Sequence, residues 1–342
     1  MTTTTQRPAP VSPVGARASG PGGDAPPHWR ETGWNPLLDT AKPLWAVIDG
    51  VNWPEISAVL VRTGTDHCCL YSTLDLESRA LAPWLARIVP GSDFARLLRA
   101  RGHGSHSYIV LSGGATLEDM RAHLRRFTML SIPDSDAPVY FRFYDPRVMI
   151  DAIEAMPASF LDSFAQPLDA IALPLSPQCL LPASSGLAGS APDPFDDAAD
   201  YLGRLLEWRR GVGMPTTRRG PAHVAQDEMA AMSARMHRRA ILKLARRLHD
   251  EFGDLTSQNR CLKVAGTAPD HAARFGLTTL AEVTAVARAQ LLFGANFDHR
   301  YPEAGDILND GALLAWQKSD RLGAWFDGML AAQWTEQESE TA

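Results

Sequence analysis

The stretch Tyr140–Val148, YFRFYDPRV, brings several groups that could do chemistry close together. It holds two arginines, two tyrosines and one aspartate, directly after the apolar pair Pro138-Val139. A carboxylate beside a guanidinium or a phenol can transfer protons or bind a charged partner. The same groups could also serve only to end a strand and start a helix.

The spacing of these residues favours the structural interpretation. On a strand, side chains alternate between the two faces. This would place Phe141 and Phe143 on one face and Tyr140, Arg142 and Tyr144 on the other. Asp145 is then placed to cap a helix that begins at Pro146, where proline loses no hydrogen bond. We expect Arg142 or Arg147 to pair with Asp145 or with a neighbouring acid.

Phosphate binding is the first alternative chemistry. A dinucleotide site needs a GxGxxG turn directly after the first strand. Here that turn reads DGVNWPE, and the SGG after a later strand is explained by turn chemistry. The Walker pattern is absent as well, so we predict no cofactor.

Metal binding and nucleophilic catalysis also lack a signature. His103 and His106 (HGSH) lie in a glycine-rich stretch, and His67 precedes the adjacent Cys68 and Cys69. No CxxC pair, HExxH or GxSxG pattern accompanies them. We therefore predict no metal ligand and no catalytic residue, and expect that the protein is not an enzyme.

Alternating strands and helices must position these residues. The sequence predicts strands at 44–49, 67–72, 107–112, 128–132 and 139–143, with the last two forming a hairpin. Helices are expected at 53–64, 92–102, 116–127 and 146–156, with Asn52 capping the first. This order predicts a Rossmann-like α/β lobe whose sheet is mostly parallel with an antiparallel edge.

Four segments follow from this pattern. Residues 1–27 predict a disordered tail, because they lack large apolar side chains. Residues 28–172 form the α/β lobe, and Trp29 and Trp34 indicate a segment that docks back on it. The stretch 173–197 reads as a linker, and 198–342 as an all-α lobe.

The longest predicted helix, 224–252, combines an apolar stripe with many arginines. Met229, Met232 and Met236 are soft enough for an adaptable partner-binding face, although core packing is the simpler interpretation. The basic positions favour ion pairs with the rest of the same lobe. The net charge of −6 argues against nucleic acid or an anionic membrane as the main partner. A reducing cytoplasm fits the four cysteines, and no apolar run has the length of a membrane span.

Several motifs resemble the type VI secretion effector adaptor family. Its members share a strand ending in Asp-Gly, an Ala-Pro-aromatic-Leu step and an aromatic-Arg-Phe-Tyr-Asp-Pro-Arg segment. This chain has Asp49-Gly50, Ala82–Leu85 with Pro83, and Tyr140–Arg147. A second stretch, Phe275–Glu303, is similar to the family's Phe-Gly, Phe-Asp and Tyr-Pro ending. The matching positions are Asp49, Gly50, Pro83, Arg142, Tyr144, Asp145, Pro146, Arg147, Phe293, Gly294, Phe297, Tyr301 and Pro302.

The resemblance implies a bacterial cytoplasmic adaptor, or effector chaperone. Such a protein binds one cognate effector, a toxin, and promotes its loading on the VgrG spike protein for delivery. Two other hypotheses remain open. The Rossmann-like lobe could bind a nucleotide or S-adenosylmethionine in a transferase or hydrolase, or the chain could be an immunity-type inhibitor of a toxin. For an adaptor, the helical lobe and the cleft between the lobes are the expected contact surface.

Overall fold

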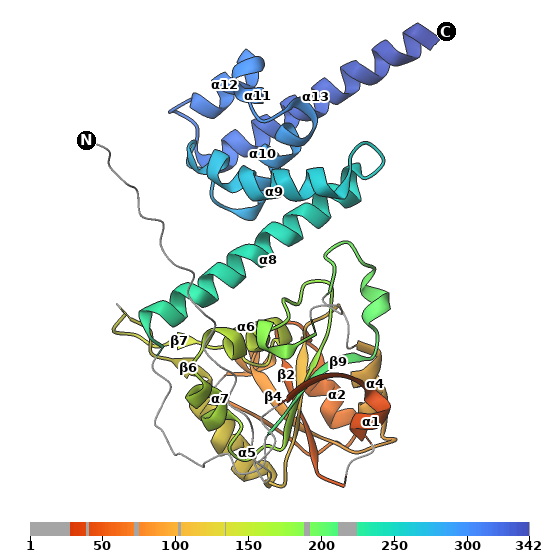
Figure 1. Ribbon diagram of the computed structural model, residues 1–342, viewed down its shortest axis with the longest axis vertical. Helices are drawn as coiled ribbons and strands as arrows, with labels where there is room; N and C mark the ends of the chain where they lie inside the picture. Colours follow the sequence, from red (N-terminus) through yellow and green to blue (C-terminus); the bar gives the residue numbers. More distant parts are fainter. Residues whose placement is uncertain are drawn as a thin grey trace, which may run out of the picture.

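The computed structural model describes residues 28–38, 41–71, 75–101, 104–133, 135–187, 192–210 and 224–341. The predicted disordered tail, 1–27, lies outside these residues. Figure 1 shows an α/β lobe and a helical lobe, with one long helix, α8 (Gln226–Phe252), running between them. Within the described ranges, no helix is both long and apolar enough to cross a membrane.

One seven-stranded sheet forms the centre of the α/β lobe. Its strands, in spatial order, are β1 (His28–Gly33), β9 (Arg204–Arg209), β8 (Ala170–Pro174), β5 (Tyr108–Ser112), β2 (Leu44–Asp49), β4 (Pro83–Ile88) and β3 (His67–Cys69). Every neighbouring pair is antiparallel. The expectation of a mostly parallel, Rossmann-like sheet is therefore wrong.

The error has a specific cause. Strands β2 and β3 do run in the same direction, as a strand–helix–strand unit predicts. However, β4 lies between them and pairs antiparallel with both. The predicted strands did not include β4, β8, β9 or β1, which supply antiparallel neighbours of β2, β3 and β5. Two strands that were predicted, β2 and β5, are also antiparallel neighbours.

Helices cover both faces of the sheet. Alternate residues along β2 point to opposite faces, so Trp45 and Val47 enter one core while Ala46 and Ile48 enter the other. The Ile48 face is covered by α1 (Trp34–Leu38), α2 (Ile56–Arg62) and α4 (Asp93–Arg101). The Val47 face is covered by α5 (Leu117–Leu124), α6 (Pro146–Ala155) and α7 (Ala158–Phe164). A short helix, α3 (Leu76–Ala80), precedes β4.

The predicted hairpin is present, but it is short. Strands β6 (Met129–Leu130) and β7 (Val139–Tyr140) pair antiparallel in a separate two-stranded sheet. The chain then leaves the extended conformation and turns, with the Asp145 amide donating to the Arg142 carbonyl at 2.9 Å. The expected strand at 139–143 therefore ends at Tyr140.

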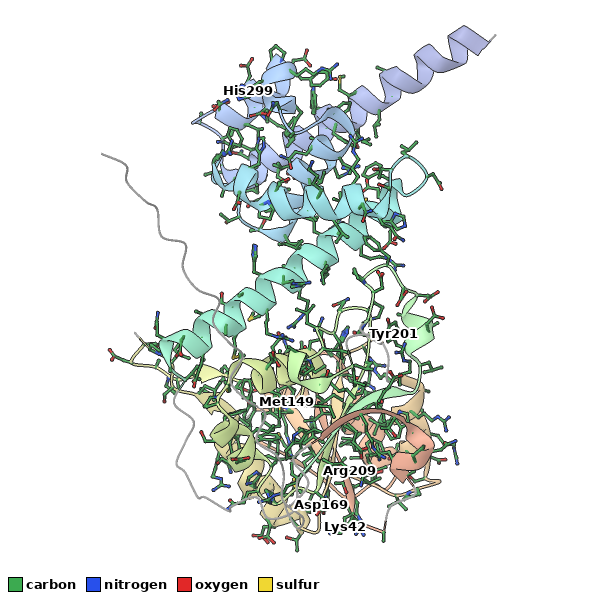
Figure 2. The ribbon with its side chains drawn as sticks, in the orientation of Figure 1. Lys42, Met149, Asp169, Tyr201, Arg209 and His299 are labelled. Atoms are coloured by element: carbon green, nitrogen blue, oxygen red, sulfur yellow. The ribbon has the colours of Figure 1, made fainter. Side chains whose placement is uncertain are left out.

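The structure agrees with the predicted docking of the N-terminal segment but not with an all-helical segment from residue 198. As expected, the N-terminal segment docks on the lobe, because Trp34 is buried in one core and Trp29 packs against the other. Residues after 198 are not wholly helical, since β9 returns the chain to the middle of the sheet. Figure 2 shows Lys42 and Asp169, which form an ion pair at 3.1 Å, at the end of this lobe remote from α8.

The helical lobe packs on the C-terminal half of α8. Its helices are α9 (Gln258–Ala273), α10 (Leu280–Phe293), α11 (Phe297–Arg300), α12 (Pro302–Asn309) and α13 (Ala315–Thr341). Leu244, Leu248 and Phe252 of α8 belong to the core of this lobe, whereas Met232, near the start of α8, belongs to the core of the α/β lobe. One continuous helix therefore takes part in both cores.

Candidate functional site at the junction of the two lobes

The site begins with Asp49, the last residue of β2. Its side chain is fully buried, and it accepts hydrogen bonds from the Val51 amide and from Asn52 Nδ2, each at 3.0 Å. The Arg142 guanidinium forms an ion pair with the same carboxylate. Burial raises the pKa of Asp49, although the bond and charge of Arg142 act in the opposite direction.

These contacts bear on two expectations. The expected pairing of Asp145 with one of the two arginines is made by Arg147, while Arg142 pairs with Asp49 across the chain. Asn52 does not cap α2, because that helix begins at Ile56 and Asn52 instead joins Asp49 to the carbonyl oxygen of His106, 3.3 Å from its Nδ2. The side chain of Asn52 therefore holds two loops together at this edge of the sheet.

Asp145 acts as the expected helix cap. It accepts from the Arg147 amide at 3.0 Å at the start of α6, and Pro146 occupies the first turn. Arg147 also bonds this carboxylate through Nε at 3.0 Å and NH2 at 2.7 Å. Burial alone would raise the pKa of Asp145, but the bonds and charge of Arg147 outweigh it and hold the pKa below its usual range.

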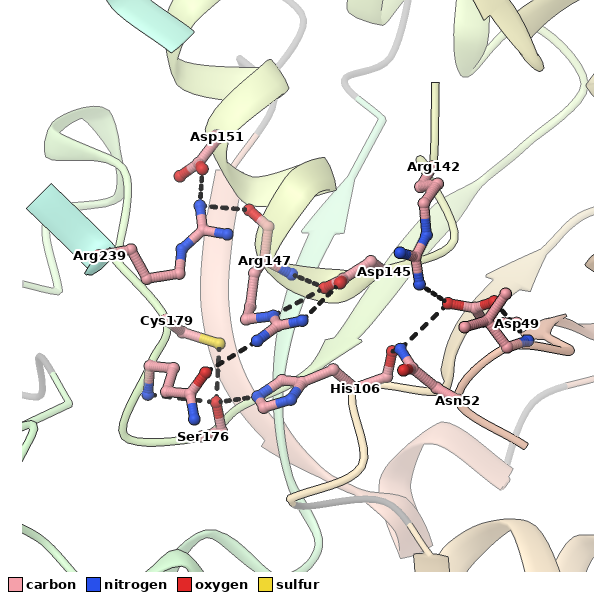
Figure 3. Close-up of polar contacts among 12 residues, drawn as sticks. Asp49, Asn52, His106, Arg142, Asp145, Arg147, Asp151, Ser176, Cys179 and Arg239 are labelled. Carbon is pink, nitrogen blue, oxygen red and sulfur yellow. Dashed lines mark hydrogen bonds and ion pairs between the residues drawn. The ribbon is translucent and has the colours of Figure 1, made fainter. Parts of the chain in front are cut away.

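A chain of polar contacts connects these two carboxylates (Figure 3). The NH1 group of Arg147 donates to Gln178 Oε1 at 2.8 Å. The backbone amide of Gln178 donates to Ser176 Oγ at 3.3 Å. Ser176 Oγ lies 2.7 Å from His106 Nε2. The carbonyl of His106 bonds Asn52, which contacts Asp49. The arrangement thus ties together loops that are distant in sequence.

The His106–Ser176 contact has the distance of a base beside a nucleophile, but its surroundings favour a positioning role. Both residues are buried, and Ser176 Oγ also lies 3.5 Å from the Sγ of the buried Cys179. Burial, together with the charge of Arg147, lowers the pKa of His106 to about 4. A general base works best with a pKa near the working pH. The backbone at His106 is left-handed, with φ 47°.

Helix α8 joins the site through Asp151 of α6. Arg235 Nε lies 2.9 Å from Asp151 Oδ1, and Arg239 forms an ion pair with the same buried carboxylate. Arg239 NH2 also lies 3.5 Å from the Arg147 carbonyl oxygen. The arginines of this helix were expected to pair within their own lobe. These two instead anchor α8 to the α/β lobe.

A cavity of about 200 Å³ lies between the lobes beside this network. Its α/β side is formed by His106, Ser176 and Gln178, and its α8 side by Leu242, Lys243 and Arg246. The segment 194–198 closes a third side, where the Arg246 guanidinium donates to the Asp196 carbonyl at 2.7 Å. A cavity is therefore present in the cleft between the lobes, which was expected as a contact surface.

Three further motif residues support the Asp49 corner. Gly50 is buried, and a Cβ there would lie 2.5 Å from the Ala82 carbonyl oxygen and closer still to that of Ala80. Pro83 begins β4 directly opposite Asp49. Tyr144 is buried, and burial with the nearby Tyr71 and Asp49 raises the pKa of its phenol.

The other five motif residues form a second cluster, in the helical lobe. Phe293 lies 5.4 Å from Tyr301 and 5.2 Å from Trp325 between ring centroids, and Phe297 is fully buried. Gly294 ends α10 with φ 96°, and Pro302 begins α12. The structure therefore divides the motif positions into two clusters, and this second one has the character of a core.

The three methionines of α8 differ in their surroundings. Met232 is buried and Met229 packs against the same core, so both already have partners within the chain. Met236 is 58% exposed. Of the predicted partner-binding face, Met236 is thus the residue open to another protein.

The histidines and cysteines weighed as metal ligands are placed as follows. His103 lies outside the described residues, and His106 contacts Ser176. His67, Cys68 and Cys69 line a separate cavity at the edge of the sheet. Among the residues that the structure describes, no group of three or more His, Cys, Asp or Glu is arranged to hold a metal ion.

Comparison with known proteins finds a family model that matches the part of the chain that holds the Asp49–Asp145 corner. Residues 44–162 match the DUF4123 model. This family is described as a domain of unknown function. The match runs from β2 into α7, so it includes both carboxylates and their arginines but neither α8 nor the helical lobe. No curated protein and no solved structure matches the chain.

The sequence identified several residues of this site, and the pairing of Asp145 with Arg147 was among the expected ion pairs. Asp49, Arg142, Asp145 and Arg147 were singled out by their motifs. Asp151, Ser176 and Gln178 were missed, because a single acid in a helix and a Ser-Pro-Gln loop carry no pattern of their own. The alternation of basic residues along α8 was the one signal that pointed to an acidic partner for that helix.

Proposed function

We propose that this protein is an adaptor that binds a cognate type VI secretion effector and promotes its loading on the VgrG spike, acting by stoichiometric binding in the cytoplasm and not by catalysis. The observation that carries the proposal is the match of residues 44–162 to DUF4123, a family associated with such adaptors. The matched range holds the segments in which the motif resemblance is most specific.

The geometry supports a clamp between the lobes as the contact site. The cavity there is lined by His106, which lies inside the matched range, and by Ser176, Gln178 and side chains of α8, which lie outside it. This arrangement suits an adaptor that shares the matched region with relatives and uses the residues around it to contact its effector. Grooves beside helices commonly receive a helix or an extended peptide of a partner.

The direction of the strands removes the structural basis of the hypothesis that the protein is a nucleotide-dependent enzyme. That hypothesis needs parallel strands whose carboxyl ends form one ligand-binding edge. In the antiparallel sheet, neighbouring strands end at opposite edges. The immunity-type inhibitor stays open as an outcome of the experiment below.

The test is co-expression with the effector encoded by the adjacent gene, followed by co-purification and a measured Kd. Leu242→Ala with Lys243→Ala should weaken binding, because both side chains line the cavity. Arg238→Ala with Arg247→Ala is the matched control, since these exposed side chains of α8 do not line it. Binding to the toxic domain alone, with loss of its toxicity, would favour an inhibitor. Secretion of every neighbouring effector without this protein would refute the adaptor.

A further inference from the structure

A second cavity lies at the outer edge of the sheet, away from α8. It has a volume of about 340 Å³ and is lined by His67, Cys68, Cys69, Tyr71, Arg79, Trp84 and Arg121. Strand β3 is the last strand of the sheet, and within the described residues its outer side pairs with no other strand. The cavity is therefore next to the outer edge of the sheet, where the side chain of Arg121 bonds the Cys69 carbonyl.

Two arginines from different elements converge on this cavity. Arg121 of α5 donates from Nε to the Cys69 carbonyl at 2.8 Å, and this bond holds its guanidinium at the strand edge. The Arg79 guanidinium lies 5.4 Å from the centroid of the Trp84 ring. Within the described residues, neither side chain forms an ion pair with a carboxylate. This distinguishes them from Arg142 and Arg147, which are both paired.

The cavity walls indicate what kind of anion would fit. A guanidinium presents a planar set of N–H donors that matches a carboxylate. Aromatic surface continues beside the arginines, since Tyr71 lies 6.1 Å from Tyr140 and Tyr140 is 73% exposed. A free inorganic anion would leave this surface uncovered. A peptide with an acidic residue next to an apolar one would use both the charges and the rings.

We propose that this cavity binds the carboxylate of an acidic peptide segment of the effector, with Arg79 and Arg121 as its ligands and Tyr71 and Tyr140 contacting the adjacent apolar side chain. The assignment rests on the proposed adaptor function for the identity of the partner. The binding of a carboxylate is inferred from the side chains that line the cavity.

Two measurements test the site. The first is the Kd of the co-expressed effector for the wild type and for Arg79→Gln with Arg121→Gln. The second is the anisotropy of a labelled peptide of alternating glutamate and leucine, with a glutamine–leucine peptide as control. We expect the double variant to weaken both by about tenfold or more, and Arg79→Lys with Arg121→Lys to restore part of the affinity.

The matched control is Arg62→Gln with Arg125→Gln, which removes the same charge from exposed positions that do not line the cavity. It should bind like the wild type. The Arg62 and Arg125 variant should leave Tm unchanged. The Arg79 and Arg121 variant should lower Tm by a few degrees, because it loses the hydrogen bond of Arg121 to the Cys69 carbonyl and the contact of Arg79 with the Trp84 ring.

The outcomes separate the two proposals. If the effector does not bind at all while the acidic peptide binds in an Arg79- and Arg121-dependent way, the adaptor function fails and the carboxylate site stands. If the acidic peptide fails to bind, or binds the double variant as well as the wild type, the site is wrong. Equal dependence on these arginines for a DNA oligonucleotide of the same charge would overturn the carboxylate assignment.

Discussion

The Arg142 guanidinium pairs with the carboxylate of Asp49, 93 residues earlier in the chain. The two ends of this ion pair are in different surroundings, because Asp49 is fully buried whereas the Arg142 side chain is 41% exposed. Replacing the arginine and replacing the aspartate should therefore lower the free energy of unfolding by different amounts.

Replacing Arg142 should be the more damaging change. Arg142→Met leaves the Asp49 carboxylate buried without its cation, at a cost of about 3 kcal/mol in the free energy of unfolding. Asp49→Asn leaves an arginine that can still reach water, so its cost should be about 1 kcal/mol. Urea denaturation of both variants and of the double variant measures the difference. Equal losses for the two single variants would contradict the burial asymmetry.

Asp145→Ala should loosen the α/β lobe. It removes the cap of α6 and the partner of Arg147, for a combined loss of about 2 kcal/mol or more. Asp75→Ala is a suitable control, because Asp75 caps α3 in the same way at an exposed position. It should cost less than Asp145→Ala, because the Asp75 cap is exposed to solvent.

Effector binding should decline with the folded fraction of the Asp145→Ala protein. This is tested by measuring Kd and Tm on the same samples. Loss of binding with an unchanged Tm would show that Asp145 contacts the effector and that its structural interpretation is wrong.

The local parts of this corner were predictable from the sequence, and the long-range parts were not. A capping aspartate, a first-turn proline and a hairpin each depend on residues a few positions apart, and the structure contains all three. The partner of Arg142 depends on which strands lie side by side. The sheet direction was mispredicted partly because β4 and the strands beyond β5 were not recognised. The pairing with Asp49 joins residues 93 positions apart, which no local pattern connects.

The same limit applies to α8. Its arginine pattern indicated ion pairs, but a sequence period shows only which residues share a face of the helix. Nothing in that period indicates that Arg235 and Arg239 face α6 of the other lobe. The single buried acid that receives them, Asp151, has no distinguishing neighbours in the sequence.

Gly50→Ala should destabilise the protein strongly. The added methyl group would overlap the carbonyl oxygens of Ala80 and Ala82, which belong to the backbone and cannot rotate away. We expect a loss of about 3 kcal/mol or more. Gly114→Ala is the matched control, because a Cβ there meets no atom within 4 Å. Thermal unfolding of the two variants compares them, and similar Tm values would show that the turn after β2 can move.

His106 should make the stability of the α/β lobe depend on pH. Burial and the charges of Arg147, Arg239 and Lys243 lower its pKa to about 4, and only Asp145 opposes this shift. The unfolded chain takes up the proton near pH 6.5. Between pH 6.5 and pH 4 the unfolded state therefore binds more protons than the folded state, and stability falls as the pH falls.

His106→Asn is the variant that tests this dependence. Asparagine tolerates the left-handed backbone at this position and does not titrate. Urea denaturation at pH 7.5, 6 and 5 should show a smaller loss of stability on acidification than in the wild type, by on the order of 3 kcal/mol if the measurement extends to pH 4. Part of the dependence of stability on pH should remain in the variant, because burial also lowers the pKa of His123 to about 4. An identical slope in the variant would mean that His106 is protonated in the folded protein, and its contact with Ser176 would then be an ionic hydrogen bond.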